Sequence, residues 1–253
     1  MRKQRNCARK GCRDLLEILL ETDPAGILVP AHIWTPHFGL LGAASGFDSV
    51  EECFEDLTPY IHAVETGLSS DPPMNWKVSA LDGLFLISNS DAHSPSKLGR
   101  EANLLDMELS YRGLYKAIQE GKGLEGTLEF FPEEGKYHYD GHRKCHVCCS
   151  PKETQKYHGI CPVCGKKLTM GVDHRVADLT DKEDGSAGEN ARTFESFVPL
   201  PEVISACVGY STASKAVTSQ YEKMLRELGT EFQILRQIPP EDIKKKSSSQ
   251  IAE

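Results

Sequence analysis

Two cysteine pairs carry the strongest chemical signal in the chain. Each pair has the spacing Cys-x2-Cys, and the second begins thirteen residues after the first ends. The four residues are Cys145, Cys148, Cys161 and Cys164. A Cys-x2-Cys turn directs two thiolates at one tetrahedral zinc ion, and a glycine follows the second pair, as in a tight zinc knuckle. Four thiolates close the coordination shell, so the pattern predicts one structural zinc ion, with His146 and Cys149 as spare candidates.

Two apolar segments end in residues that bind metals. Asp91 and His93 follow the segment LFLIS, and His32 follows GILVPA. Residues two apart on an extended chain point to the same side, so Asp91 and His93 can face one cluster of divalent ions. Carboxylate and imidazole together suit Zn²⁺, Mn²⁺ or Fe²⁺. Considered alone, Asp91 could equally well cap the segment that follows it. Considered alone, His32 is better interpreted as a core residue. The three residues together favour a metal site.

Short apolar segments alternate with amphipathic ones over residues 14–131. The periodicity predicts helices at 13–24, 49–57, 73–81 and 110–123, and strands at 26–31, 60–66, 84–88 and 126–131. Ser49 and Glu52 form a capping box, and Gly121 closes the fourth helix. The alternation predicts an α/β fold with a parallel sheet, whose active site lies at the carboxyl ends of the strands. Glu65 also falls at such an end.

The composition predicts five segments along the chain. They are a basic leader (1–12), an α/β region (13–135), a zinc-binding module (136–180), a flexible linker (181–192) and a helical region (193–253). Two helices are expected in the last of these, at 200–209 and 213–229, with no clear element after them.

The charge of the chain is uneven. Its 253 residues carry a net charge of −8, but residues 136–175 hold eight Lys/Arg against three Asp/Glu. This segment therefore carries +5 and the remainder −13. It also holds five of the nine histidines and five of the nine cysteines. A phosphate-binding surface depends on local charge, so the segment is a candidate for nucleic-acid binding; a solvated charged loop is the alternative.

The sequence contains no sign of a membrane or secretory segment. No stretch approaches the roughly 18 apolar residues of a membrane span, and the basic N-terminus has no apolar segment behind it. We therefore expect a cytoplasmic protein without a membrane partner. Nine cysteines in that setting indicate metal ligands or buried thiols, and Cys53 and Cys207 are expected in the core.

Four motifs lie in order along the chain. They are PAHIWTPHFGLLGAASGFDS (30–49), AVETGLSSDPPMNW (63–76), SNSDAHSPSKLGREAN (88–103) and EFFPEEGKYHYDGHRKC (129–145), the last followed by the cysteine pairs. Together they resemble endonuclease Q, a DNA-repair nuclease family of the PHP (polymerase and histidinol phosphatase) superfamily. The resemblance runs from about residue 13 to about residue 235.

The resemblance implies a fold and an activity. The fold would be the C-terminal part of a PHP-type distorted (β/α)7 barrel, followed by a four-cysteine zinc ribbon and a small helical region. The activity would be hydrolysis of the phosphodiester 5′ of deaminated bases (uracil, hypoxanthine, xanthine) or at abasic sites by metal-activated water. DNA containing such bases would be the partner, and the family leaves room for a replication or repair protein as a second one.

The resemblance also implies roles for residues. His32, Asp91 and His93 match ligands of a catalytic Zn, Mn or Mg cluster, and the four cysteines match the structural zinc module. A lesion nuclease must expose its target base, so a pocket of aromatic and polar groups is expected. Candidates for the site rim or for DNA contact are Trp34, His37, Glu65, Trp76, Lys97, Arg100, His138 and His142. Lys97 and Arg100 are equally compatible with a salt-bridged surface.

The sequence departs from the family pattern before residue 13. The family barrel begins with a His-x-His pair and further ligands, and MRKQRNCARKG resembles nothing in that portion. We therefore expect the C-terminal part of a longer protein, inactive as a nuclease on its own. Two other functions remain open. One is a non-catalytic DNA-binding remnant that uses the zinc ribbon and the C-terminal helices. The other is a PHP-type phosphoesterase of small esters, against which the basic module argues.

Overall fold

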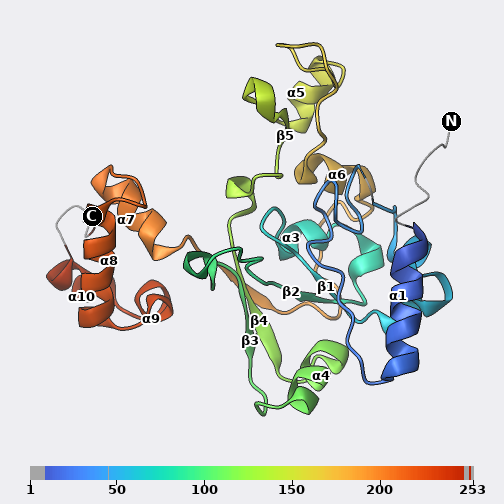
Figure 1. The fold of residues 1–253 in the computed structure, drawn as a ribbon, viewed down its shortest axis with the longest axis horizontal. Helices are drawn as coiled ribbons and strands as arrows, with labels where there is room; N and C mark the ends of the chain where they lie inside the picture. The colour runs from blue at the N-terminus through green and yellow to red at the C-terminus, as the bar shows by residue number, and fades with distance from the viewer. Residues whose placement is uncertain (1–8, 45, 248–250, 252–253) are drawn as a thin grey trace. The chain divides into compact units, whose positions relative to one another are not determined.

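The chain folds into two compact units (Figure 1). The first unit contains both helices and strands, and the second is helical. The computed structural model describes residues 9–44, 46–247 and 251. The first unit ends at Ser196 and the second begins at Phe197. Residues 1–8 of the predicted leader, which include Cys7, lie outside the described residues. Within the described part of the chain, every helix is too short or too polar to cross a membrane.

Helix α1 (Arg9–Thr22) confirms the helix expected near the N-terminus and begins inside the predicted leader. Its apolar spacing buries Leu16, which is 1% exposed. The Arg13 guanidinium donates to both carboxylate oxygens of Asp56, at 2.8 and 3.0 Å, and so joins α1 to the 3-10 helix η1 (Glu55–Tyr60). The helix stops before Pro24 because the residue preceding a proline disfavours helical geometry.

Residues 26–31 were expected to form a strand, and that prediction is wrong. The segment lies extended beside Glu65, which donates its N–H to the Pro30 carbonyl oxygen (3.1 Å) and accepts from the Ile33 N–H (3.1 Å). Pro30 has no N–H to donate, so the ladder cannot continue through it.

The first sheet consists of β1 (Ala63–Glu65) and β2 (Phe85–Ile87), paired in parallel as expected. Between them lie α3 (Pro72–Asn75) and the 3-10 helix η2 (Ser79–Leu81), two short elements in place of the one helix predicted over 73–81.

Helix α2 (Val50–Phe54) precedes the first sheet and shows half of the predicted capping box. Ser49 accepts from the Glu52 N–H at 3.1 Å, as expected. The Glu52 carboxylate instead accepts from the N–H of Asp48 at 2.9 Å, one residue earlier than a capping box requires.

The second sheet is mixed and has the order β3–β4–β7. Strand β3 (Ala102–Leu105) runs antiparallel to β4 (Leu124–Glu129), and β7 (Thr193–Ser196) runs parallel to β4 (Figure 1). The expectation of a wholly parallel sheet is therefore wrong, because β3, which the periodicity missed, returns beside β4. Helix α4 (Tyr111–Glu120) joins β3 to β4 and ends at Gly121 with φ +66°, the left-handed cap that the sequence predicted.

The described strands form short open sheets, so the closed barrel stays a prediction. Three sheets are present among the described residues, of two, three and two strands. The α/β class of the fold is confirmed.

The cysteine-rich region follows β4 in the chain and is anchored by one helix. It contains β5 (Asp140–His142), the 3-10 helix η5 (Arg143–Cys145), β6 (Val147–Cys149) and α5 (Pro151–Lys156), and β5 and β6 form an antiparallel pair. Helix α6 (Val172–Leu179) then buries Val172 and Val176 in the main core of the first unit.

The segment expected to be a flexible linker (181–192) is part of the first unit and contacts its other residues. The Lys182 ammonium donates to both carboxylate oxygens of Asp82, at 2.9 and 2.8 Å, and the Ser79 N–H donates to Asp181 at 2.8 Å. The five-segment division of the chain stays a prediction.

The second unit is helical. It contains α7 (Leu200–Val208), α8 (Lys215–Leu228), α9 (Glu231–Arg236) and α10 (Pro240–Lys246). The first two confirm the predicted helices, and the last two were not expected. Their core is formed by Leu200, Ile204, Val217, Met224 and Ile234. Cys207 is exposed, so its predicted core position is wrong, whereas Cys53 is buried as expected.

Trp34 belongs to the main core of the first unit. Its side chain is 1% exposed, and its indole N–H donates to the side-chain amide oxygen of Asn75 (Oδ1) at 2.8 Å. We expect Trp34→Ala to lower the free energy of unfolding by about 3–5 kcal/mol, because a large buried ring leaves a cavity. Phe38→Ala is the matched control, since Phe38 is 77% exposed, and it should cost at most about 0.5 kcal/mol. Equal midpoints in the urea unfolding curves of the two variants would contradict the assignment of Trp34 to the core.

Candidate metal sites

The carboxyl ends of β1 and β2 lie at one edge of the first sheet, where the sequence placed a metal. Glu65 ends β1 and is buried. Its carboxylate accepts from the backbone N–H of His32 at 2.6 Å and from the side-chain amide of Asn89 at 2.8 Å. Asn89 in turn accepts from the Asn103 amide at 3.0 Å. A hydrogen-bonded network therefore fixes this edge and the backbone at His32.

His32 is held in an unusual conformation. Its φ is +32°, a left-handed value that is costly for a residue with a Cβ. A Cβ at Gly67 would lie 2.7 Å from the Cβ of His32, so only glycine fits beside it. The Nδ1 atom of His32 is buried and has no hydrogen-bond partner among the described residues. A buried ring nitrogen without a partner can bind a metal ion or form a hydrogen bond with a bound ligand. The predicted role of His32 as a metal ligand is compatible with this position.

Asp91 and His93 lie in the loop after β2. Asp91 also has a positive φ, +44°. The His93 Nδ1–H donates to the Asp91 carbonyl oxygen at 2.9 Å, which leaves Nε2 open, and the His93 side chain is 87% exposed. In the described part of the chain, these two residues and His32 do not form a compact group of metal-binding atoms. Their role as ligands stays a prediction.

The other predicted rim residues are dispersed. Trp34 is in the core, and Trp76 packs edge-to-face on Phe194, with ring centroids 5.8 Å apart. His138 is buried and donates from Nδ1 to the Ser69 carbonyl oxygen at 3.2 Å. Arg100 donates to the Ser90 carbonyl oxygen at 2.9 Å. Lys97 ends the 3-10 helix η3 (Pro95–Lys97) and is exposed. A contact with DNA stays a prediction for Trp76, Lys97 and Arg100, whereas burial of the Trp34 and His138 side chains, at 1% and 6% exposed, leaves them almost no surface for DNA.

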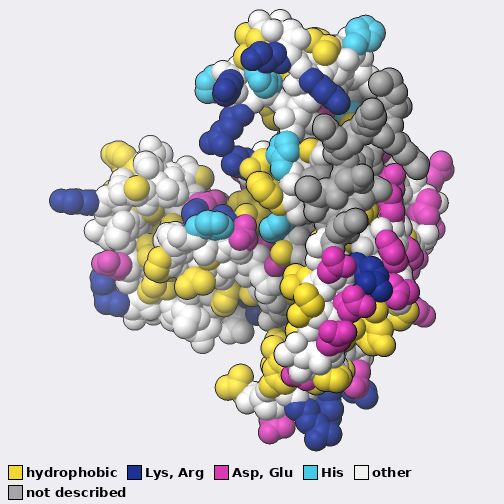
Figure 2. Space-filling model, turned by 45° about the vertical axis from the view of Figure 1, so that its right-hand side comes forward, with side chains coloured by type: hydrophobic (Ala, Val, Ile, Leu, Met, Phe, Trp, Pro, Cys, Tyr) yellow, Lys and Arg dark blue, Asp and Glu magenta, His cyan; other side chains and the backbone are white. Residues whose placement is uncertain are grey.

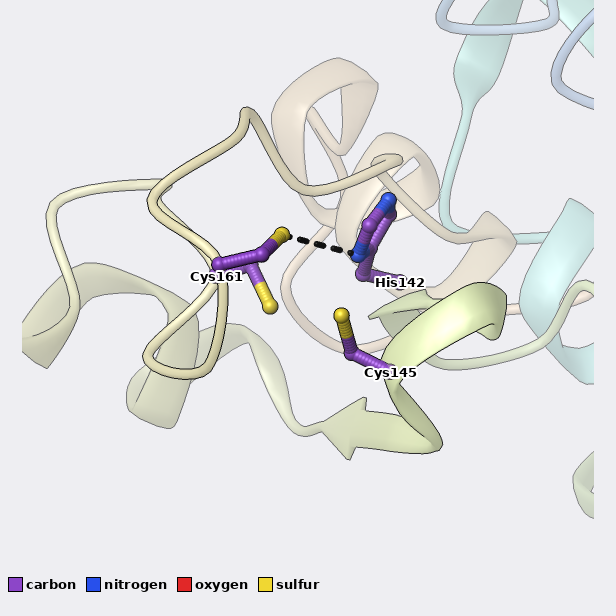
Figure 3. Close-up of side chains that lie close together, drawn as sticks. His142, Cys145 and Cys161 are labelled. Carbon is purple, nitrogen blue, oxygen red and sulfur yellow. Dashed lines mark hydrogen bonds between the residues drawn. The ribbon is translucent and has the colours of Figure 1, made fainter.

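The cysteine region contains one compact group of metal-binding side chains. The potential ligand atoms of this group all lie within 4.8 Å of one another. Its members are His142, Cys145, Cys161 and Cys164. The Cys164 sulfur lies 3.3 Å from Nδ1 of His142. Figure 3 shows the side chains of His142, Cys145 and Cys161 turned toward a common space.

Local backbone geometry brings these four residues together. After Cys145, His146 takes a left-handed conformation (φ 53°) that turns the chain into β6. On the other side, Gly165 has φ +69° and donates its N–H to the Cys161 carbonyl oxygen at 2.9 Å, closing the knuckle predicted there. Glycine is favoured at this position because it adopts positive φ without strain.

Cys148 is not a member of the group, and His142 takes the fourth position. Cys148 lies in β6 opposite Gly141, and it is exposed, whereas the next residue, Cys149, is buried. Side chains alternate between the two faces of a strand, so one of these cysteines must point away from the other. The ligand set predicted from the cysteines alone therefore needs correction. His142-x2-Cys145 repeats the spacing of a Cys-x2-Cys pair, and this signal in the sequence could have identified His142.

The two cysteines at the centre of the group differ in acidity. The pKa of Cys145 is raised to about 11, chiefly by its contact with the Cys164 thiol and by burial. Burial also acts to raise the pKa of Cys161, but the backbone N–H groups of Cys164 and Val163 outweigh it and lower that pKa to about 7. Of these two thiols, Cys161 is therefore the more readily ionised for metal binding.

The donor set fits a structural zinc ion. Three thiolates and one imidazole are soft donors that provide a complete tetrahedral shell and leave no open position for a substrate. His142, Cys145, Cys161 and Cys164 would hold the ion, which would cross-link β5, η5 and the 161–164 knuckle.

Two cavities flank the cysteine region in the first unit. The first, of about 570 Å³, is lined by His37, His158, His174 and Lys167 together with neutral side chains, and among the described residues no Asp or Glu lines it. The second, of about 420 Å³, is lined by Lys136, Arg143 and His142 among others, and His37, Thr169 and Met170 line both cavities.

The surface around these cavities is basic. Asp140 lines the second cavity, but one of its carboxylate oxygens accepts from the Gly171 N–H at 2.5 Å and the other from His174 Nδ1 at 2.6 Å. On the face shown in Figure 2, Lys, Arg and His side chains gather at the height of α5 and β5, and acidic side chains lie lower, on the side of α1.

Comparison with known proteins gives matches along most of the chain. Residues 199–253 match the family model described as the MJ0043 C-terminal domain. The chain is 32% identical over 197 residues to protein MJ0043 of Methanocaldococcus jannaschii, covering 75% of this chain and 24% of the relative. It is 30% identical over 225 residues to YqxK of Bacillus subtilis, covering 87% of this chain and 53% of the relative. The chain thus spans about a quarter and about half of these two relatives.

Two solved structures have the same fold. The lesion-specific endonuclease Q of Pyrococcus furiosus matches with a TM-score of 0.81 and 28% identity, over 95% of this chain and 59% of the other. A structure of endonuclease Q with a 27-mer duplex carrying an abasic lesion at the active site matches with a TM-score of 0.84 and 28% identity, over 95% of this chain and 60% of the other. The resemblance seen in the sequence is confirmed: 95% of this chain is similar in structure, at 28% sequence identity, to part of endonuclease Q.

Proposed function

We propose that this chain is part of a DNA-repair endonuclease that hydrolyses the phosphodiester 5′ of a damaged nucleotide. The substrates would be DNA with deaminated bases (uracil, hypoxanthine, xanthine) or with abasic sites. The observation that supports this most is the match, at a TM-score of 0.84 over 95% of the chain, to endonuclease Q bound to a duplex with an abasic lesion.

The residues of this chain would supply one side of the catalytic centre. His32 offers a buried Nδ1 without a partner among the described residues. His93 has Nδ1 at 3.9 Å from a carboxylate oxygen of Asp91 and would offer its other ring nitrogen, Nε2, to a metal. Glu65 keeps the backbone of His32 in place through its 2.6 Å hydrogen bond. Divalent ions held there would supply hydroxide from water and would neutralise charge on the phosphate.

We also propose that the chain by itself binds DNA but does not cut it. Within the described residues, the four-residue group at His142 is the only compact group of three or more His, Cys, Asp or Glu side chains. A multinuclear catalytic centre needs more ligands than His32, Asp91 and His93 provide. The cavities beside the cysteine region offer an electrostatic surface for phosphates, and this favours non-catalytic DNA binding as the function of the isolated chain.

A binding and nicking assay tests both statements. We expect the chain to bind a uracil-containing duplex with an affinity that falls steeply with salt. We expect no nicking with added Mg²⁺, Mn²⁺ or Zn²⁺. Metal-dependent nicking by the chain would contradict its inactivity, and salt-independent binding would contradict the role of the basic cavities.

The cavity residues provide a sharper test. Changing Lys136, Arg143 and Lys167 together to Ser should reduce the slope of log affinity against log salt by about 2 to 3, because each lost phosphate contact removes nearly one unit. Lys116→Ser on α4 is the control, since Lys116 is exposed and lines neither cavity. A slope unchanged in the triple variant would place the DNA elsewhere on the chain.

A further inference from the structure

Two buried glutamates face each other across the second sheet. In the antiparallel ladder Ala102 lies opposite Leu128, so the register places Glu101 opposite Glu129. Both side chains are interior, at 2% and 0% exposed. Residues in such positions have their Cβ atoms about 5 Å apart, and like charges there are destabilising. This pair needs a compensating partner.

The carboxylate oxygens of this pair are largely without hydrogen bonds. Both oxygens of Glu101, Oε1 of Glu129 and the hydroxyl of Thr127 are buried and make no hydrogen bond of good geometry among the described residues. The Thr127 hydroxyl and the Phe130 N–H nevertheless lie close enough to stabilise the Glu129 and Glu101 carboxylates respectively. Thr127 is 2% exposed and lies two residues before Glu129, on the same face of β4. Four incompletely satisfied oxygens therefore lie in one part of the interior, where incomplete hydrogen bonding costs free energy.

Basic side chains compensate the pair only weakly. Neither oxygen of Glu101 has a hydrogen-bond partner among the described residues, and Arg100, whose charge has a small effect on Glu101, donates instead to the Ser90 carbonyl oxygen. Two neighbouring carboxyl groups add to the negative potential: Glu65 acts on Glu101, and Asp71 acts on Glu129.

We propose that Glu101, Glu129 and Thr127 bind a hard divalent cation such as Mg²⁺ or Ca²⁺. All of the donors are oxygen atoms, which these ions prefer, and the site contains neither imidazole nor thiolate. It is therefore distinct in chemistry from both the His/Cys zinc cluster and the predicted His32, Asp91 and His93 ligands.

The site would stiffen the edge that carries the predicted catalytic residues. Glu129 Oε2 accepts from the hydroxyls of Thr66 and Ser88, each at 3.0 Å. Thr66 follows Glu65 at the end of β1, and Ser88 follows the end of β2. A cation that holds Glu129 thus connects β3 and β4 to both strand ends. This inference does not depend on nuclease activity.

Unfolding of the zinc-loaded chain tests the site without any activity assay. Both tryptophans of the chain, Trp34 and Trp76, lie in the first unit, so fluorescence reports on that unit. In buffer freed of other divalent ions, added Mg²⁺ or Ca²⁺ should raise the unfolding midpoint in a saturable way. No saturable shift with either ion in the unaltered protein would overturn the proposal, whatever the variants do.

Three variants locate the ion. Glu101→Gln and Glu129→Gln should each abolish the saturable shift. Glu125→Gln, an exposed position on the same strand β4, and His93→Ala should both retain it. Loss of the shift in His93→Ala with retention in the two buried variants would assign the ion to the predicted catalytic centre and would refute this site. If a Gln variant fails to fold, absence of a shift in the unaltered protein still overturns the proposal, and loss of the shift in His93→Ala still refutes this site.

Discussion

Cys161→Ser is expected to abolish stoichiometric zinc binding and to unfold the cysteine region. Cys161 is buried at 1% exposure and contributes one of the four grouped ligand atoms. Structural zinc contributes on the order of 10–16 kcal/mol of apparent binding free energy in small zinc domains, so the loss is large. The measurements are zinc per chain by elemental analysis and hydrogen exchange of the β5 and β6 amides, which should lose protection.

A pair of variants distinguishes the two ligand sets. His142→Ala should lose zinc, whereas Cys148→Ser should keep one zinc per chain, because Cys148 lies outside the group. The reverse result would restore the four-cysteine set predicted from the sequence.

The stability of the first unit should fall as pH rises from about 5 to about 9 in the absence of added divalent cations. Burial, followed by the charge of Glu129, raises the pKa of Glu101 to about 9 from 4.5. Burial raises the pKa of Glu129 to about 7, although the hydroxyls of Thr127, Ser88 and Thr66 act to lower it. Between the unfolded and folded pKa values, the folded state holds a proton that the unfolded state has released. Stability therefore decreases with pH in this window, by up to about 1.4 kcal/mol per pH unit and per group.

Glu101→Gln should flatten this dependence above pH 7, because an amide does not ionise. Urea midpoints followed by tryptophan fluorescence at several pH values provide the measurement, and Glu125→Gln is the matched control on the same strand. A profile that rises with pH, or one that is identical in Glu101→Gln and the unaltered protein, would show that the buried pair does not govern stability.

Local signals in the sequence determined several elements. Helix α1 followed from apolar spacing, the end of α4 from Gly121, and the start of α2 from Ser49. The zinc knuckle at Cys161-x2-Cys164 followed from spacing alone. These features depend on interactions between residues a few positions apart, which a sequence displays directly. The motifs likewise sufficed for the relation to endonuclease Q.

Only the tertiary structure decided which distant residues meet. The pairing of β5 with β6 exposes Cys148 and leaves the fourth ligand position to His142. The antiparallel register of β3 on β4 places Glu101 against Glu129 although 28 positions separate them in the chain. Burial of Trp34 and the exposure of Cys207 depend in the same way on packing partners far along the chain. Strand register and burial arise from contacts between remote segments, and a periodicity within one segment does not specify them.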